Sequence, residues 1–192
     1  VLEAARQHAV KRIVMASSAA NYGNNPELPK REEMKPEPES PYAIGKIVGE
    51  YYFSVYRELY GMETTALRYF NVFGPRQDPG SMYSGVISKF TDVLRGDGTP
   101  TVFGDGQQTR DFVFVGDVVR ANLLAMRSDE AGTGSVFNVG TGRQASLLDL
   151  LSVLGELTDR TVEPLFADAR AGDIRHSVSA IDKARSTLGY AP

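Results

Sequence analysis

Residues 40–69 read SPYAIGKIVGEYYFSVYRELYGMETTALRY, a helix pattern followed directly by a strand pattern. Apolar side chains recur at intervals of three or four over Pro41–Tyr60, which predicts an amphipathic helix. Gly61 is a typical residue to end such a helix. The segment Thr64–Tyr69 (TTALRY) then predicts a strand. This helix–strand unit indicates an α/β chain.

The rest of the chain continues the alternation. We expect further strands at 12–16, 99–103, 111–115, 135–139 and 162–166. We expect further helices at 1–12, 84–95, 117–127 and 181–188, and one that begins at Ser146. Ser146 and Asp149 have the spacing of a capping box. Alternating elements predict βαβ units and a parallel sheet with both faces covered by helices.

Composition narrows the class of protein. The 192 residues contain 21 Lys and Arg, 24 Asp and Glu, and no Cys, for a net charge of −3. The scattered, slightly acidic charge argues against a nucleic-acid-binding surface. No apolar run approaches the length of about 18 residues that a membrane span needs. Two histidines, His8 and His176, are too few and too far apart for an ordinary zinc site, so no metal is expected. We expect a cytoplasmic protein.

Polar residues follow several predicted strands directly. Ser17 and Ser18 follow the first strand, Phe70 and Asn71 follow the second, and residues 138–140 end a later one. In open parallel sheets, ligands bind beyond the carboxyl ends of the strands. A serine at this place also suits an ordinary turn, so its position alone does not assign a role.

Tyr42 and Lys46 are four positions apart, which places them on one face of the predicted helix. A phenol has an ordinary pKa of about 10, and a neighbouring ammonium favours its ionised form. The pair therefore suits an acid/base group. A core tyrosine beside a surface lysine explains the spacing equally well.

Four segments in this order give a more specific signal: RIVMASSAANYG at 12–23, SPYAIGK at 40–46, TTALRYFNVFGPRQ at 64–77 and VFGDGQQTRDFVFVGDVV at 102–119. Together they resemble the extended short-chain dehydrogenase/reductases that act on nucleotide sugars, and most of all the UDP-hexose 4-epimerases. The resemblance covers essentially the whole chain. It implies part of a Rossmann-like doubly wound parallel sheet at 1–70 and a smaller α/β substrate-binding lobe over most of 71–192. Residues 111–140 would return to the sheet.

The resemblance implies roles for residues near the first two strands. Ser18 would be the catalytic hydroxyl and Tyr42 the catalytic base. Lys46 would hold the nicotinamide ribose of NAD and assist Tyr42. Ser17 and Phe70 would line the nicotinamide side.

It also implies a set of residues that bind a UDP-sugar. Arg110 and Arg170 would hold the diphosphate, since guanidinium groups offer paired donors to phosphate oxygens. Asn71 would contact the diphosphate as well. Phe103 would contact the uracil, and Asp173 the uridine ribose. Phe103 would suit a core position equally well.

Three alternatives remain. Related dehydratases carry an Asp-Glu pair just after the catalytic hydroxyl residue, and related decarboxylases carry a Glu nearby. Here Ala19 and Ala20 occupy those positions, which favours epimerisation. The third alternative is a non-catalytic binding protein with the same fold.

Ser177 takes a position where some family members carry a bulky Tyr that excludes N-acetylated sugars. A small residue there predicts that UDP-N-acetylglucosamine and UDP-N-acetylgalactosamine are accepted along with UDP-glucose and UDP-galactose. An ordinary loop serine is the other explanation.

The resemblance also bears on assembly and on the ends of the chain. Relatives form homodimers through long helices, and Tyr51, Tyr52, Tyr56 and Tyr60 would suit such a face or a core. The sequence begins with a helix-like pattern and contains no G-x-x-G-x-x-G segment. We therefore expect the 192 residues to lack a preceding NAD-binding part and to be inactive alone.

Overall fold

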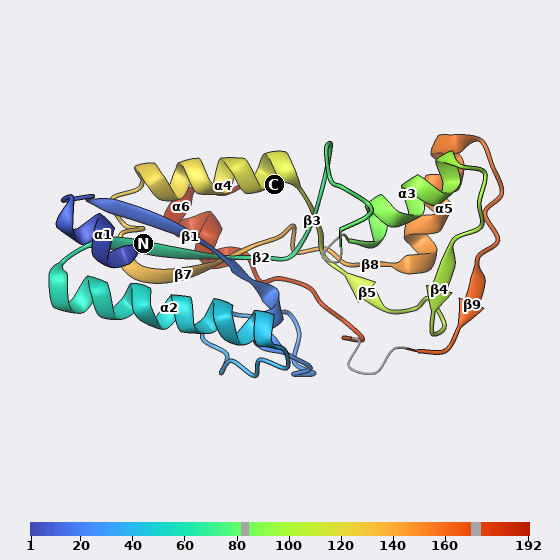
Figure 1. The fold of residues 1–192 in the computed structure, drawn as a ribbon. Helices are drawn as coiled ribbons and strands as arrows, with labels where there is room; N and C mark the ends of the chain where they lie inside the picture. The colour runs from blue at the N-terminus through green and yellow to red at the C-terminus, as the bar shows by residue number, and fades with distance from the viewer. Residues whose placement is uncertain (82–84, 170–173) are drawn as a thin grey trace.

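A computed structural model describes residues 1–81, 85–169 and 174–192 of the chain. The fold has two lobes that lie side by side (Figure 1). The larger lobe is built on a parallel sheet in the order β1–β2–β7, which confirms the predicted Rossmann-like α/β class. Its strands are β1 (Arg12–Ser18), β2 (Glu63–Tyr69) and β7 (Thr133–Val139). One face of this sheet is covered by α2 (Pro41–Tyr60) and the other by α4 (Val115–Arg127) and α6 (Asp182–Leu188).

The central strand and its helix form as their sequence predicts. The middle of β2 is almost completely buried, and its Leu67 lies opposite Phe137 of β7 in the core. Helix α2 has the predicted bounds. The Ser40 side chain caps its start by accepting a hydrogen bond from the amide of Ala43. Gly61 ends it in the left-handed conformation, with a φ of 68°, which glycine adopts without steric cost.

The smaller lobe packs two helices on a two-stranded parallel sheet. Its elements are α3 (Val86–Arg95), α5 (Leu147–Thr158), β4 (Thr101–Phe103) and β9 (Leu165–Ala167). Phe90, Val102 and Leu151 are at the centre of its apolar core. The predicted capping box at the start of α5 is confirmed, with Ser146 and Asp149 bonded reciprocally.

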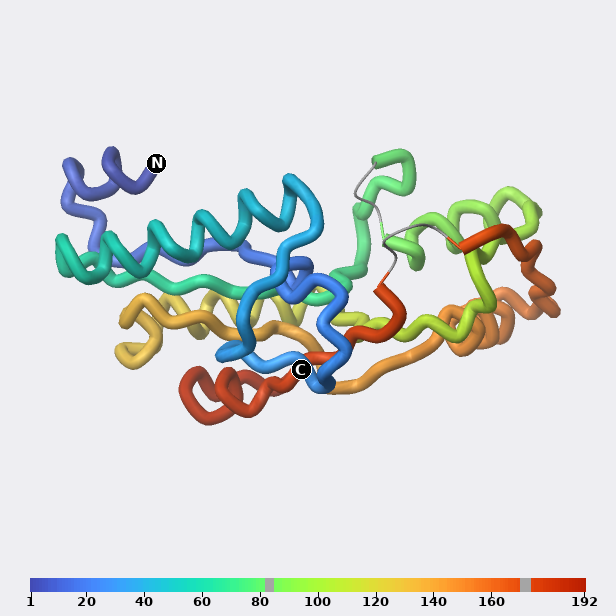
Figure 2. The backbone as a smooth tube through the Cα atoms, turned by 90° about the horizontal axis from the view of Figure 1, so that it is seen from below, coloured from blue at the N-terminus to red at the C-terminus, as the bar shows by residue number. Residues whose placement is uncertain are grey.

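Short elements connect the two lobes. A parallel pair joins β3 (Asn71–Phe73) to β6 (Phe112–Phe114), and an antiparallel pair joins β5 (Thr109–Arg110) to β8 (Ala145–Ser146). Figure 2 shows that segments distant in sequence run between the lobes close to one another. Each lobe is therefore assembled from separate stretches of the chain.

Several element bounds differ from the sequence-based expectation. The first helix, α1 (Leu2–Gln7), is shorter than the expected 1–12 because Ala9 has a φ of 52°, outside the helical region. The strand expected at 162–166 begins only at Leu165, since Val162 packs against the core of the smaller lobe. The strand expected at 111–115 ends at Phe114, where α4 begins. In the part of the chain that the structure describes, no helix is long and apolar enough to span a membrane.

An exposed ion pair joins the turn that follows β4 to the segment that contains Arg175. Arg175 donates hydrogen bonds to both carboxylate oxygens of Asp105, each at 2.7 Å. These bonds lower the pKa of Asp105 from 3.8 to about 2. Because the pKa is lowered in the folded chain, the pair stabilises the fold above pH 3.8, and this contribution is lost as the pH falls through about 2. Solvent screening keeps the contribution small.

Replacing Arg175 by Gln should raise the pKa of Asp105 toward 3.8, since the carboxylate loses its cationic partner. An NMR pH titration of the side-chain carboxyl carbons measures this directly. Asp149, whose pKa is lowered by the Ser146 hydroxyl, serves as an internal control and should titrate as before. An Asp105 pKa that stays near 2 in the variant would contradict the assigned cause.

Candidate active site

A cavity of about 360 Å³ opens at the carboxyl end of the main sheet. It brings together six residues that the sequence singled out: Ser17, Ser18, Tyr42, Lys46, Phe70 and Asn71. They come from the end of β1, the first turns of α2 and the junction of β2 with β3. The parallel alignment of β1 with β2 places these ends at the same edge of the sheet.

Tyr42 and Lys46 lie on one face of α2, as their spacing predicts. The Lys46 Nζ atom donates a hydrogen bond to the carbonyl oxygen of Ala16 at 2.8 Å. It also lies 5.4 Å from the centre of the Tyr42 ring. Tyr42 is 47% exposed, so the ring is accessible and is not the core tyrosine of the alternative explanation. The ammonium therefore lies over the face of the Tyr42 ring.

The two neighbouring serines have different surroundings. The Ser18 Oγ atom accepts a hydrogen bond from the amide of Ala20 at 3.1 Å and thereby caps the short 3₁₀ helix η1 (Ala19–Tyr22). This leaves the Ser18 hydroxyl able to donate to a ligand. Ser17 is buried, and its hydroxyl donates to Glu50 Oε1 at 2.5 Å. Ser18 is thus the serine better suited to contact a reacting group.

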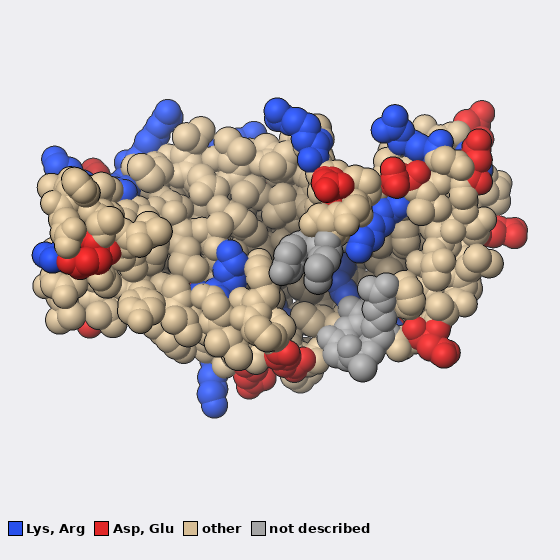
Figure 3. Space-filling view, in the orientation of Figure 1, with Lys and Arg blue, Asp and Glu red and all other residues tan. Residues whose placement is uncertain are grey.

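A neighbouring cavity of about 310 Å³ extends from Ser18 toward the smaller lobe. Asn71, Arg110 and Ser177 line it, together with Ala19 and Ala20. No Asp or Glu belongs to the described residues that line it. Figure 3 shows positively charged side chains in the hollow between the lobes. The two cavities share Ser18, Tyr69, Phe70 and Asn71, so they form one continuous candidate site.

The remaining predicted residues are less closely associated with this site. Phe103 ends β4 opposite Ala167, and its carbonyl accepts a hydrogen bond from Gln108. It is not among the residues that line either cavity. Arg170 and Asp173 lie outside the described residues.

A buried ion pair beside the site was not predicted from the sequence. Glu50 on α2 and Arg68 on β2 are each almost fully buried, and Arg68 donates to both carboxylate oxygens, at 2.9 and 2.7 Å. Burial alone would lower the pKa of Arg68, but its hydrogen bonds to Glu50 produce a net rise. Two features of the sequence could have revealed the pair. Glu50 stands four residues after Lys46, on the same helix face, and Arg68 is a charged residue inside a predicted strand.

The Arg68 guanidinium also contacts an aromatic ring. It lies 4.8 Å from the centre of the Tyr22 ring at the end of η1. Burial raises the pKa of Tyr22 to about 12, so its hydroxyl stays protonated and donates to Asn138 Oδ1 at 2.7 Å. Asn138 also donates to the backbone carbonyls of Lys30 and Ala180. Asn138, the next-to-last residue of β7, is thus a structural residue although it lies at the carboxyl end of a strand.

Asp111 is the second buried carboxylate near the site, next to Arg110 in sequence. It accepts hydrogen bonds from the amides and hydroxyls of Thr141 and Ser179 and from the amide of Gly142. These donors satisfy a buried charge that would otherwise be costly. Asp111 thereby joins the segment that carries Arg110 to residues 141–142 and to Ser179. A Cβ atom at Gly140 would come within 2.6 Å of the Asp111 carboxylate, so the close approach requires glycine.

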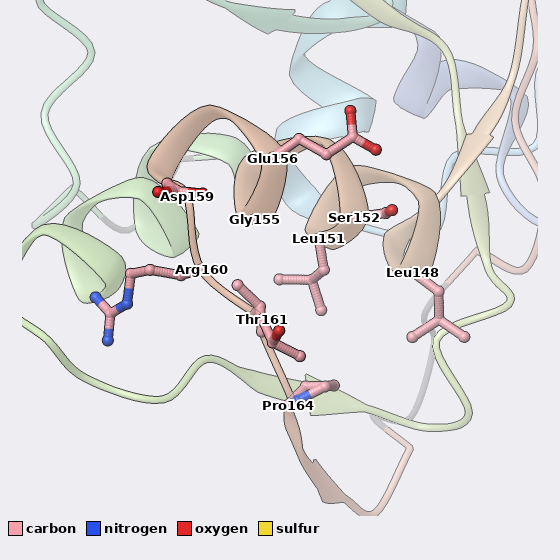
Figure 4. A pocket seen from close by; sticks show the side chains of 10 residues that line it. Leu148, Leu151, Ser152, Gly155, Glu156, Asp159, Arg160, Thr161 and Pro164 are labelled. Atoms are coloured by element: carbon pink, nitrogen blue, oxygen red, sulfur yellow. The ribbon is translucent and has the colours of Figure 1, made fainter.

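A different hollow in the smaller lobe is larger, about 500 Å³, and lies between α5 and the segment that follows it (Figure 4). The Arg160 side chain at its edge donates to Leu94 O and Asp97 Oδ1, which lie on the side of α3. Leu148, Leu151 and Val162 supply apolar walls. This hollow contains none of the predicted site residues, and volume alone does not make it the site.

Residues 1–140 match the model of the NAD dependent epimerase/dehydratase family. A curated relative, the UDP-glucose 4-epimerase of Mycolicibacterium smegmatis, is 42% identical over 191 residues, which cover 99% of this chain and 60% of that protein.

Solved structures that are similar to this chain agree with the family match. The UDP-N-acetylglucosamine 4-epimerase from Methanobrevibacter ruminantium M1, in complex with UDP-N-acetylmuramic acid, has a TM-score of 0.94 and 36% identity, covering 99% of this chain and 60% of that one. The UDP-glucose 4-epimerase from Thermotoga maritima, with UDP-glucose, has a TM-score of 0.93 and 42% identity, covering 100% of this chain and 61% of that one. The chain thus spans about 60% of the length of such relatives. It belongs to the NAD dependent epimerase/dehydratase family.

Proposed function

We propose that the protein interconverts the C4 epimers of a UDP-hexose with NAD as its cofactor, through a transient 4-keto sugar. The observation that carries this proposal is the convergence of Ser18, Tyr42 and Lys46 on one cavity that continues past Asn71 to Arg110. Family membership supports it, as do the relatives named as UDP-glucose and UDP-N-acetylglucosamine 4-epimerases.

The residues around the cavity fit the nicotinamide end of NAD. When bound, NAD would accept a hydride from the sugar C4 and return it. Lys46 donates one of its N–H groups to Ala16, and its remaining donors suit ribose hydroxyls. Phe70 and Ser17 would border the ring. The 192 residues contain no G-x-x-G-x-x-G segment for the pyrophosphate.

Tyr42 and Ser18 would transfer the proton of the sugar 4-hydroxyl. Tyr42, as phenolate, would take the proton of the sugar 4-hydroxyl as C4 is oxidised, and would return it to the sugar oxygen after the 4-keto sugar has turned over. The Ser18 hydroxyl would bridge the sugar oxygen and the phenol, because its oxygen already accepts from the Ala20 amide and its hydrogen can be donated outward. Lys46 would stabilise the charged phenol oxygen.

The rest of the site would hold the nucleotide. We propose that residues 1–70 contribute to the cofactor-binding domain and that 71–192 form mainly the sugar-nucleotide lobe, with about 111–140 returning to the sheet. Arg110 and Asn71 would bind the diphosphate, and both line the cavity next to Ser18. Phe103, Arg170 and Asp173 stay predicted ligands of the nucleotide.

The same site argues against elimination or decarboxylation. Both reactions in this family were expected to need a carboxylate next to Ser18. Ala19 and Ala20 stand there, and the described lining of that cavity contains no acid. A non-catalytic binding protein would have no need to keep Ser18, Tyr42 and Lys46 together. Epimerisation is therefore the reaction that the site supports best.

Two further proposals concern sugar choice and assembly. Ser177 is small and lines the cavity near Ser18, which supports acceptance of N-acetylated UDP-sugars. Helix α2 presents an exposed apolar face that supports a homodimer. Its members are Ile44, Val48, Tyr51, Tyr52, Val55 and Leu59. A cytoplasmic location stays a prediction from composition.

Tyr42→Phe in the full-length protein should abolish epimerisation while UDP-sugar binding changes little, because only the proton-accepting oxygen is removed. A coupled assay of UDP-galactose conversion and calorimetric titration with the UDP-sugar measure the two properties. Tyr60→Phe, at the far end of the same helix, is the matched control and should remain active. Undiminished turnover in Tyr42→Phe would disprove the role.

Ser177→Tyr in the full-length protein should reduce activity on UDP-N-acetylglucosamine much more than on UDP-glucose, because the ring fills the space beside the sugar. Comparing kcat/KM for the two substrates tests this. Ser152→Tyr, on the exposed side of α5, should change neither value. An equal loss on both substrates would rule out Ser177 as a selectivity residue.

Tyr51→Glu in the full-length protein should convert a dimer to a monomer, since it places a charge in the centre of the apolar face of α2. Sedimentation velocity gives the mass. Leu157→Glu, at a position that is also exposed but lies in the smaller lobe, should leave the dimer intact. A wild-type protein that sediments as a monomer would refute the dimer.

A further inference from the structure

We propose that Glu50 is a positioning residue that sets the placement of Ser18 relative to Tyr42; the inference rests on the epimerase function proposed above. Glu50 does not line either cavity at the candidate site. It would act through the residues on both sides of Ser18.

One oxygen of Glu50 binds both flanks of the Ser18 turn. Glu50 Oε1 accepts from Ser17 Oγ at 2.5 Å and from Asn21 Nδ2 at 2.8 Å. Asn21 Nδ2 also lies 3.2 Å from Ser17 Oγ, so the three groups form a closed triangle. Ser18 and the start of η1 lie between these two attachment points in the sequence. The carboxylate therefore fixes the turn whose first hydroxyl is that of Ser18.

The carboxylate is itself held on the helix that carries the proposed base. Tyr42, Lys46 and Glu50 follow one another at four-residue steps along α2, on a single face. Lys46 binds the backbone of β1 at Ala16, and Glu50 binds the next side chain at Ser17. Helix α2 is thus fastened to the end of β1 at two successive residues. Tyr42 and Ser18 consequently keep a fixed relation.

Arg68 prevents Glu50 from turning. It donates to both carboxylate oxygens from β2, while its guanidinium lies over the Tyr22 ring at the other end of η1. The oxygen of the Asn21 amide, unlike its nitrogen, does not contribute to holding the side chain. Asn21 Oδ1 is buried and has no hydrogen-bond partner among the described residues. The amide is therefore oriented by Glu50 and Ser17 through its nitrogen.

The test uses Glu50→Gln and Asn21→Ala in the NAD-loaded full-length protein. Asn21→Ala removes one attachment of the turn and leaves the buried ion pair intact. It therefore tests the positioning role of Glu50 even if Glu50→Gln does not fold. The matched control is Thr64→Val, which removes a buried hydrogen bond between β2 and α2 at Phe53, far along the same interface. Measured quantities are kcat, KM, the UDP-sugar Kd and the melting temperature.

We expect kcat to fall about 10-fold to 100-fold in the two variants, with KM and the UDP-sugar Kd within about twofold of wild type. Thr64→Val should lower the melting temperature and keep its kcat. A folded Asn21→Ala protein with wild-type kcat would overturn the proposal. The proposal would also be overturned if Thr64→Val lowered kcat as much as Asn21→Ala does when the two variants lose the same amount of melting temperature.

A wild-type protein without epimerase activity would instead refute the proposed function. The positioning of Ser18 is then decided by a crystal structure of Asn21→Ala. A Ser18 displaced from Tyr42 relative to the wild-type structure would support the inference, and an unmoved Ser18 would overturn it.

Discussion

Parallel alignment of β1, β2 and β7 is the constraint on which the candidate site depends. Because the strands run in the same direction, their carboxyl ends meet at one edge of the sheet. That edge brings Ser18 from the end of β1 next to Phe70 and Asn71 from the end of β2. Helix α2 then starts on the same side and adds Tyr42 and Lys46. The candidate site residues thus come from separate segments of the chain, and the sheet brings them together.

Two buried carboxylates stabilise this edge in different ways. Glu50 is neutralised by a guanidinium with two hydrogen bonds, whereas Asp111 relies on neutral amide and hydroxyl donors. Removing one partner of a buried ion pair typically costs about 3–5 kcal/mol, because the other charge is left uncompensated. A site bordered by such groups tolerates few changes in its supporting residues. Glu50 joins α2 to β1, η1 and β2, whereas Asp111 holds the loop at residues 141–142 and the segment at Ser179.

The sequence predicted the parts of the fold that depend on local pattern. Helix α2 was predicted with correct bounds, because Ser40, Pro41 and Gly61 are local signals for its start and end. The capping box of α5 was found for the same reason. Strands β3, β5 and β8 were missed, since segments of two or three residues acquire their conformation from distant partners.

The same distinction holds for the site. The motifs indicated Ser18, Tyr42 and Lys46, and the structure brings them around one cavity. Glu50 and Arg68 were missed because an acidic residue on a helix is ordinarily read as a solvated one. The two residues come into contact because β2 packs against α2. Phe103 shows the converse, since a motif position suggested a ligand contact and the residue does not line the described cavities.

The central position of β2 has a consequence for synthesis on the ribosome. One neighbour, β1, precedes β2 along the chain, but the other, β7, follows much later. The hydroxyl of Thr65 bonds to the carbonyl of Ala131, 66 positions further along. Until that segment emerges, one edge of β2 offers unpaired amides and carbonyls to any extended peptide nearby. Closing so long a loop slows folding, so the nascent chain is exposed to aggregation for the time needed to translate the segment between β2 and β7.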